Sequence, residues 1–167
     1  GIDVYGEKPL AKTFAEGQAI VDAVTAAAKV AHRYADHRAT AVRERLASWL
    51  GVDSSSVTVG AGSVGILQQL FLTFVDPGDE VVYPWRSFEV YPVYTRLMAG
   101  KEVTTPLNAQ HGFDLDALAA AIKPSTRMVI LATPNNPTGT ALRVGEMREL
   151  LRGIDPSTVV VIDEAYR

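Results

Sequence analysis

The apolar residues of the chain repeat at helical spacing in its first third and form short continuous runs later. Helical spacing is clearest over Thr40–Leu50, where apolar residues lie at i, i+4, i+7 and i+8 from Val42. Gly51 follows this segment, and glycine readily adopts the left-handed conformation at the end of a helix. The alanine-rich stretch Glu16–Tyr34 predicts one or two short helices, whereas residues 1–15 show no clear period and predict an extended arm.

Beyond Gly51, short apolar runs alternate with helical segments. The runs that predict strands are Val57–Gly60, Glu80–Tyr83, Lys101–Thr105, Arg127–Ala132 and Thr158–Ile162. The segments that predict helices are one capped by Ser63, Phe88–Ala99 followed by Gly100, one from an Asp114 cap to Ile122, and one around Glu146–Leu151. The strands lack polar–apolar alternation, which is typical of a sheet with helices on both faces. The pattern therefore predicts an α/β fold with three layers, α/β/α, and a mostly parallel sheet.

Length and composition restrict the class of protein. A chain of 167 residues suits one compact unit with an appended arm, and 47% hydrophobic against 21% charged residues argues against wholesale disorder. The formal net charge is −3 and no basic run exceeds two residues, so nucleic acid is not an expected partner. The longest apolar run, Ala117–Ile122, is too short to span a membrane, and no signal peptide opens the chain. We therefore expect a cytoplasmic protein.

The chain contains no cysteine, which excludes disulfides, thiolate metal sites and a cysteine nucleophile. Its histidines, His32, His37 and His111, show no ligand spacing, so no metal site is expected. In an open parallel sheet, ligands bind outside the carboxyl ends of the strands. The loops that follow the predicted strands are therefore the place where functional side chains are expected.

Two of these loops carry groups suited to a phosphate and a planar ring. The turn at 60–63 precedes a predicted helix, whose free N–H groups can bind an anion together with the Ser63 hydroxyl. The alternative is an ordinary tight turn with a serine cap. Phe88 follows the strand Glu80–Tyr83 and could stack on a planar ligand, a contact worth roughly 0.5–1.5 kcal/mol beyond area burial. The alternative is that Phe88 belongs to the core.

Two later loops carry amide, carboxylate and phenol groups. Asn135 and Asn136 stand between prolines, and a cis bond before Pro137 would fix a side-chain amide toward the strand end. Turns also favour these residue types, which is the alternative explanation. Asp163 follows a β-branched run, so we expect it at the rim of the sheet, partly buried, with a cationic or hydrogen-bonding partner. A buried structural salt bridge is the alternative for Asp163.

Taken together, the four loops suit a single ligand. An anion site at a helix N-terminus, an aromatic face, an amide, a carboxylate and the phenol of Tyr166 match a phosphorylated, planar, nitrogen-containing ring. Pyridoxal 5′-phosphate has each of these features, and it is the cofactor that the sequence predicts.

The motifs resemble those of the fold-type I, class I/II pyridoxal-phosphate-dependent aminotransferases, most closely the histidinol-phosphate and aromatic (phenylalanine) aminotransferase group. The resemblance is found in GAGS at 60–63, DPGDEVVYPWRSFEVY at 76–91, TPNNPTGT at 133–140 and VVVIDEAY at 159–166. It runs from about Tyr5 to the end of the chain and covers about the first half of such an enzyme. It implies a homodimer in which residues 1–39 form an arm and helix that contact the partner. Residues 40–167 would be the first part of the large cofactor-binding domain, incomplete at its C-terminal end.

The resemblance implies roles for single residues around the phosphate and the substrate. Ala61, Gly62 and Ser63 would bind the cofactor phosphate. Tyr34 would reach the phosphate that is bound by the other subunit of the dimer. Tyr5 lies in the arm that closes over the substrate in this group.

The resemblance also implies roles around the pyridine ring. Phe88 would stack on the ring, and Asn136 and Tyr166 would donate hydrogen bonds to its phenolic oxygen. Asp163 would pair with the ring nitrogen, where a negative charge favours the protonated form. The charged ring can then accept the electrons released when the substrate loses its Cα proton.

The sequence departs from the family pattern in one important respect. The lysine that forms the Schiff base is expected after the element that ends at Tyr166, whereas the lysines present all precede it: Lys8, Lys12, Lys29, Lys101 and Lys123. We therefore expect no catalytic residue in this chain, which alone would be inactive and bind the cofactor weakly at most. Val64-Gly65 and Trp85-Arg86 differ from the common choice of the histidinol-phosphate enzymes and favour the aromatic branch.

The activity implied by the resemblance is transfer of an amino group between an amino acid and a 2-oxo acid, with histidinol phosphate or aromatic compounds as substrates. A pyridoxal-phosphate-dependent decarboxylase or lyase, similar to threonine-phosphate decarboxylase, shares every motif and is an alternative. A non-catalytic module that keeps the fold for binding is another.

Overall fold

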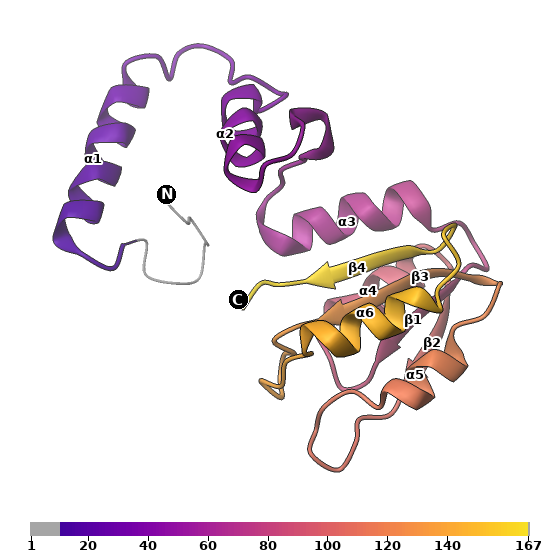
Figure 1. The fold of residues 1–167 in the computed structure, drawn as a ribbon. Coiled ribbons are helices and arrows are strands. Elements are labelled where there is room, and N and C mark those ends of the chain that lie inside the picture. Colours follow the sequence, from indigo (N-terminus) through magenta and orange to yellow (C-terminus); the bar gives the residue numbers. More distant parts are fainter. Residues whose placement is uncertain (1–10, 167) are drawn as a thin grey trace. The chain divides into compact units, whose positions relative to one another are not determined.

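The computed structural model describes residues 11–166 (Figure 1). The chain forms two compact units, Gly1–Gly62 and Ser63–Arg167. Tyr5, which is expected in the substrate-closing arm, lies outside the described residues. Within the described residues, no helix has both the length and the apolar character needed to cross a bilayer.

The regular elements in the described part of the first unit are helices. Helix α1 (Phe14–Ala28) begins at a capping box, in which the Thr13 side chain accepts from the Glu16 N–H and the Glu16 carboxylate accepts from the Thr13 N–H. Helix α2 (Thr40–Leu50) has the predicted bounds and ends at Gly51, whose φ of 70° is left-handed. A short 3₁₀ helix, η1 (Ser54–Ser56), follows.

The expectation of a strand at Val57–Gly60 is wrong, because the described residues form no strand there. Arg43 of α2 holds this segment instead, since its guanidinium donates to the carbonyls of Val57 at 2.7 Å and Ser54 at 2.6 Å. A strand forms only where a neighbouring strand supplies its hydrogen bonds, and the sheet among the described residues pairs elsewhere. The apolar character of residues 57–60 was therefore not enough to fix their conformation.

The second unit contains a four-stranded parallel sheet in the order β2-β1-β3-β4. The strands are β1 (Glu80–Pro84), β2 (Lys101–Thr105), β3 (Thr126–Ala132) and β4 (Val159–Asp163). β2 has the predicted bounds, β1 and β3 each differ from the prediction by one residue at one end, and β4 is shifted by one residue at both ends. The central strands β1 and β3 are almost fully buried, which explains why their sequences lack alternation.

Helices cover both faces of this sheet (Figure 1). One face packs against α3 (Gly62–Phe74) and α4 (Val90–Leu97) through a core that includes Phe71, Tyr83 and Tyr91. The other face packs against α5 (Leu115–Ala121) and α6 (Val144–Arg152). The predicted three-layer α/β/α architecture with a mostly parallel sheet is therefore confirmed.

Helices α3 and α4 differ from the prediction at their ends. Helix α3 begins at Gly62, so Ser63 lies inside its first turn and is not its N-cap. Helix α4 is shorter than the expected Phe88–Ala99, because it begins at Val90 and ends at Leu97. At its C-terminal end, Ala99 has a left-handed φ of 54° and the Gly100 N–H donates to the Thr95 carbonyl at 2.8 Å. A Cβ at Gly100 would lie 3.2 Å from that carbonyl oxygen, a tight contact that favours glycine at this position.

The strand order creates a switch point in the middle of the sheet. The chain passes from β1 through α4 to β2 on one side, and from β3 through α6 to β4 on the other side. The loops after β1 and β3 therefore diverge toward opposite faces although their strands are neighbours. A crevice opens at the carboxyl ends of such strands, and this is where ligands bind in open α/β sheets.

Candidate functional site

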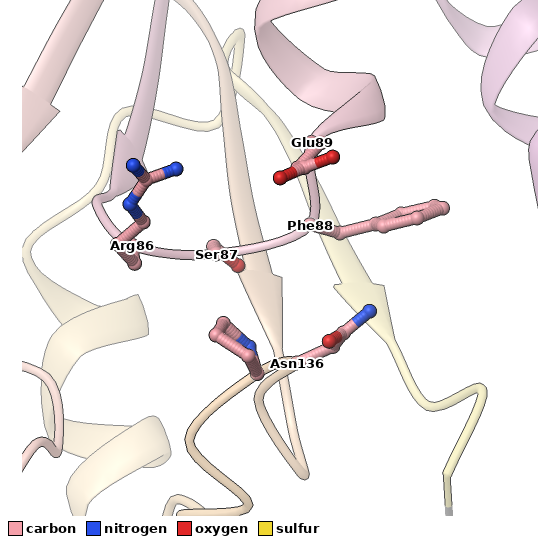
Figure 2. A pocket seen from close by; sticks show the side chains of 6 residues that line it. Arg86, Ser87, Phe88, Glu89 and Asn136 are labelled. Atoms are coloured by element: carbon pink, nitrogen blue, oxygen red, sulfur yellow. The ribbon is translucent and has the colours of Figure 1, made fainter.

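A cavity of about 490 Å³ lies between the loops that follow β1 and β3, at the switch point of the sheet. Its lining residues are Arg86, Ser87, Phe88, Glu89, Asn136 and Pro137 (Figure 2). In Figure 2 the Phe88 ring and the Asn136 amide extend to the same side, away from the Arg86 side chain. The structure thus brings together the aromatic residue and the amide that the sequence predicted for one ring-shaped ligand.

Asn135 ties the two loops of the cavity to each other. It is 2% exposed, and its side-chain oxygen Oδ1 accepts from the Ser87 hydroxyl at 2.7 Å. Its amide nitrogen donates to the Arg86 carbonyl at 3.1 Å and to the Thr138 hydroxyl at 2.9 Å. Asn136, the next residue, lines the cavity instead, and the peptide bond between Asn136 and Pro137 is cis, as the sequence suggested. The two asparagines therefore have different surroundings.

This difference predicts that two neighbouring substitutions affect stability to different extents. Asn135→Ala leaves the buried Ser87 hydroxyl and the Arg86 carbonyl without their partners, so we expect the free energy of unfolding to fall by about 1–3 kcal/mol. Asn136→Ala removes a cavity-lining amide and is expected to change that free energy by only about 0.5 kcal/mol. Denaturant titration of both variants measures the difference. Equal losses of stability would contradict the assignment of the loop contacts to Asn135.

Asp163 occupies the last position of β4, at the same end of the sheet. It pairs with Ala132 in the β3–β4 register, and its carbonyl accepts from the Thr133 N–H at 2.9 Å. Its carboxylate accepts from the Tyr91 hydroxyl at 2.7 Å through Oδ2 and from the Ala165 N–H at 3.1 Å through Oδ1. The partners of Asp163 among the described residues are thus hydrogen-bond donors, and neither of the ion pairs found there includes it. Asp163 therefore forms no salt bridge with the described residues.

Tyr91 connects Asp163 to the aromatic residue of the cavity. It is fully buried, and its ring meets the Phe88 ring edge-on, with centroids 5.8 Å apart and planes at 86°. Burial raises the pKa of the Tyr91 phenol, and the negative charge of Asp163 raises that pKa further. The phenol therefore stays protonated and donates to the carboxylate.

The sequence did not single out Tyr91, although a signal was present. Tyr91 lies three residues after Phe88 in a segment that was expected to be helical, and residues at this spacing lie on one face of a helix. That face packs on an apolar sheet, and a buried tyrosine hydroxyl needs a hydrogen-bond partner there. A search for a polar group at a strand end would have led to Asp163.

The other predicted site residues have more exposed positions. Ala61, Gly62 and Ser63 are exposed at the start of α3, where Gly62 has a left-handed φ of 68°. Tyr166 follows β4 and is 50% exposed. Tyr34 is fully exposed in the first unit. The roles assigned to these residues stay predictions.

Known proteins with similar sequences and folds are aminotransferases. The family model for aminotransferase class I and II matches residues 7–167. The aromatic amino acid aminotransferase of Rhodococcus opacus is 46% identical over 145 residues, covering 87% of this chain and 40% of that protein. The enzyme of the same name from Corynebacterium glutamicum strain R is 43% identical, covering 92% of this chain and 45% of that protein. The chain thus spans less than half the length of these relatives.

Solved structures agree with the sequence matches. The histidinol-phosphate aminotransferase of Sinorhizobium meliloti, in complex with pyridoxal-5′-phosphate, has a TM-score of 0.80 at 28% identity, covering 88% of this chain and 40% of that chain. An aspartate aminotransferase from Rhizobium meliloti has a TM-score of 0.76 at 26% identity, with 87% and 40% covered. The expected fold type and its cofactor, pyridoxal phosphate, are confirmed for the family. This chain belongs to the family of class I and II aminotransferases.

Proposed function

We propose that this chain forms the first part of the cofactor-binding domain of an aminotransferase, which transfers an amino group between an amino acid and a 2-oxo acid. The single observation that best supports this is the arrangement at the switch point. Phe88 and Asn136 line one cavity. Asp163 is the last residue of β4, which pairs with β3, the strand that precedes the Asn136 loop. These groups are an aromatic face, an amide and an anion. They suit the face, the phenolic oxygen and the protonated nitrogen of a pyridine ring, respectively.

Each of these residues has a chemical counterpart on the pyridine ring. When bound, pyridoxal phosphate supplies the electron sink for loss of the substrate's Cα proton. The Asp163 carboxylate would hold a proton on the ring nitrogen, because an opposite charge at contact distance favours both charged forms. Phe88 would pack against the ring, and Asn136 and Tyr166 would donate to its phenolic oxygen. The Tyr91 hydroxyl and the Ala165 N–H donate to the carboxylate in the structure.

The start of α3 is proposed to hold the phosphate. The N–H groups of Ala61 and Gly62 and the Ser63 hydroxyl would donate to its oxygens, and the positive end of the helix dipole favours an anion there. The Gly62 N–H donates to the Gly60 carbonyl at 3.0 Å in the structure, so it would exchange that bond for one to the phosphate. In a homodimer, Tyr34 would reach the phosphate bound by the partner subunit, and Tyr5 would contact the substrate. None of the lysines of this chain is proposed to bind the cofactor covalently.

We propose aromatic amino acids as substrates. The supporting observation is that the sequence relatives at 43–46% identity are named aromatic amino acid aminotransferases. The histidinol-phosphate enzymes match mainly in fold, at 28% and 23% identity.

Steady-state kinetics of the full-length protein with pyridoxal phosphate and a 2-oxo acid test this proposal. We expect kcat/KM for phenylalanine or tyrosine to exceed that for histidinol phosphate at least about tenfold. A preference for histidinol phosphate would contradict the substrate assignment. Release of carbon dioxide without amino transfer would contradict the reaction class.

A further inference from the structure

We propose that Tyr91 is a positioning residue, which fixes the Asp163 carboxylate in the orientation that meets the cofactor's ring nitrogen. This inference rests on the proposed function, because it assumes that Asp163 faces the pyridine ring. It goes beyond that function in assigning a role to a buried helix residue that would not itself touch the cofactor.

The first argument is the geometry of the carboxylate. Each oxygen of Asp163 accepts one hydrogen bond, from Tyr91 at 2.7 Å and from the Ala165 N–H at 3.1 Å. Two donors on different oxygens fix both the position and the rotation of the group. A carboxylate has about four acceptor positions, so further acceptor capacity remains for a ring N–H. The carboxylate is therefore held while still able to bind.

The second argument is that Tyr91 is itself held rigidly. Tyr91 is 0% exposed. The centroid of its ring lies 5.9 Å from that of Tyr83 and 5.8 Å from that of Phe88. The Thr95 hydroxyl donates to its backbone carbonyl at 2.8 Å. A side chain packed on several sides loses little further freedom when it donates a hydrogen bond, so it can hold the carboxylate firmly.

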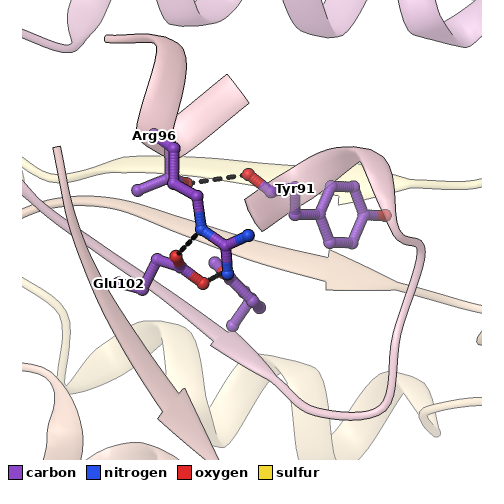
Figure 3. Close-up of polar contacts among 5 residues, drawn as sticks. Tyr91, Arg96 and Glu102 are labelled. Carbon is purple, nitrogen blue, oxygen red and sulfur yellow. Dashed lines mark hydrogen bonds and ion pairs between the residues drawn. The ribbon is translucent and has the colours of Figure 1, made fainter. Parts of the chain in front are cut away.

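The third argument is the charge around the phenol. The ion pair between Arg96 and Glu102, 2.6 Å apart, lies toward the other end of α4, and the Tyr91 ring extends away from it (Figure 3). Asp163 is the charged group that the Tyr91 hydroxyl contacts. An ionised carboxylate can only accept, so the Tyr91 hydroxyl is the donor of this hydrogen bond.

A merely structural tyrosine would stabilise the fold without acting through Asp163, and a double-mutant cycle separates these roles. The dissociation constant of pyridoxal phosphate is measured by fluorescence titration of the full-length protein. We expect Tyr91→Phe to raise it about tenfold, since a hydrogen bond to a charged group is lost. Tyr94→Phe is the matched control on the same helix, because that hydroxyl contacts the Val64 carbonyl at 3.4 Å, and less than about a twofold change is expected.

The same substitution is then made in an Asp163→Ala background. If Tyr91 acts through Asp163, Tyr91→Phe has no further effect on the dissociation constant there. Equal effects in both backgrounds would show a structural role and overturn the inference. The ¹⁵N chemical shift of bound, ¹⁵N-labelled pyridoxal phosphate is a second readout, which should move with Tyr91→Phe and stay constant with Tyr94→Phe.

The outcomes distinguish this inference from the proposed function. If the parent protein binds pyridoxal phosphate and Asp163→Ala weakens binding while Tyr91→Phe does not, only the role of Tyr91 is wrong. If the parent protein shows no saturable binding of pyridoxal phosphate, the proposed function is wrong, and the inference about Tyr91 is then wrong as well.

Discussion

Asp163→Asn is expected to lower kcat on the order of 10²–10³-fold while the protein keeps its fold. The amide has nearly the same volume as the carboxylate and keeps one oxygen that can accept from Tyr91. It removes the negative charge, however, and with it the interaction that keeps a proton on the cofactor's ring nitrogen. The loss should therefore appear in the chemical step, because the ring becomes a weaker electron sink.

Steady-state kinetics with an aromatic amino acid, together with thermal unfolding, measure this effect. Glu164→Gln is the control, since it neutralises the adjacent, exposed carboxylate and should change kcat less than about twofold. Turnover of Asp163→Asn at the level of the parent protein would refute the assignment of Asp163.

Phe71→Ala is expected to lower the free energy of unfolding by about 3–5 kcal/mol. Phe71 is 0% exposed in the core between α3 and the sheet, and its ring lies 5.6 Å from that of Tyr94 on α4. Truncation to alanine removes its apolar contacts and leaves a cavity that rigid strands on one side cannot close. The same change loosens α3, the helix whose start is proposed to bind the phosphate.

Denaturant titration compares this variant with Leu72→Ala, the next residue on the helix. Leu72 is 64% exposed, so its truncation should cost no more than about 0.5 kcal/mol. If the two variants lose similar amounts of stability, the packing of α3 on the sheet is not as described.

Local signals were sufficient for much of the fold. The bounds of α2 were predictable because its apolar spacing and Gly51 agree, and β2 was predictable because turn residues enclose it. The conformation of residues 57–60 was not predictable from local signals, because such a segment becomes a strand only where another strand pairs with it. Helix α4 ended early because Ala99 adopts a left-handed conformation, which residue type did not indicate.

The candidate site was partly predictable from the rule that ligands bind at the carboxyl ends of parallel strands. That rule led to the loops of Phe88, Asn136 and Asp163. It did not separate the buried Asn135 from the cavity-lining Asn136, because the path of the loop decides which side chain faces inward. Tyr91 was missed because its role depends on a contact between residues 72 positions apart.

The most direct test is a crystal structure of the full-length protein with pyridoxal phosphate bound. The ring nitrogen is expected at about 2.7–2.9 Å from an Asp163 oxygen, with Phe88 against the ring and the Asn136 amide at its phenolic oxygen. A cofactor bound away from the carboxyl ends of β1, β3 and β4, or with its ring nitrogen turned away from Asp163, would contradict the proposed site.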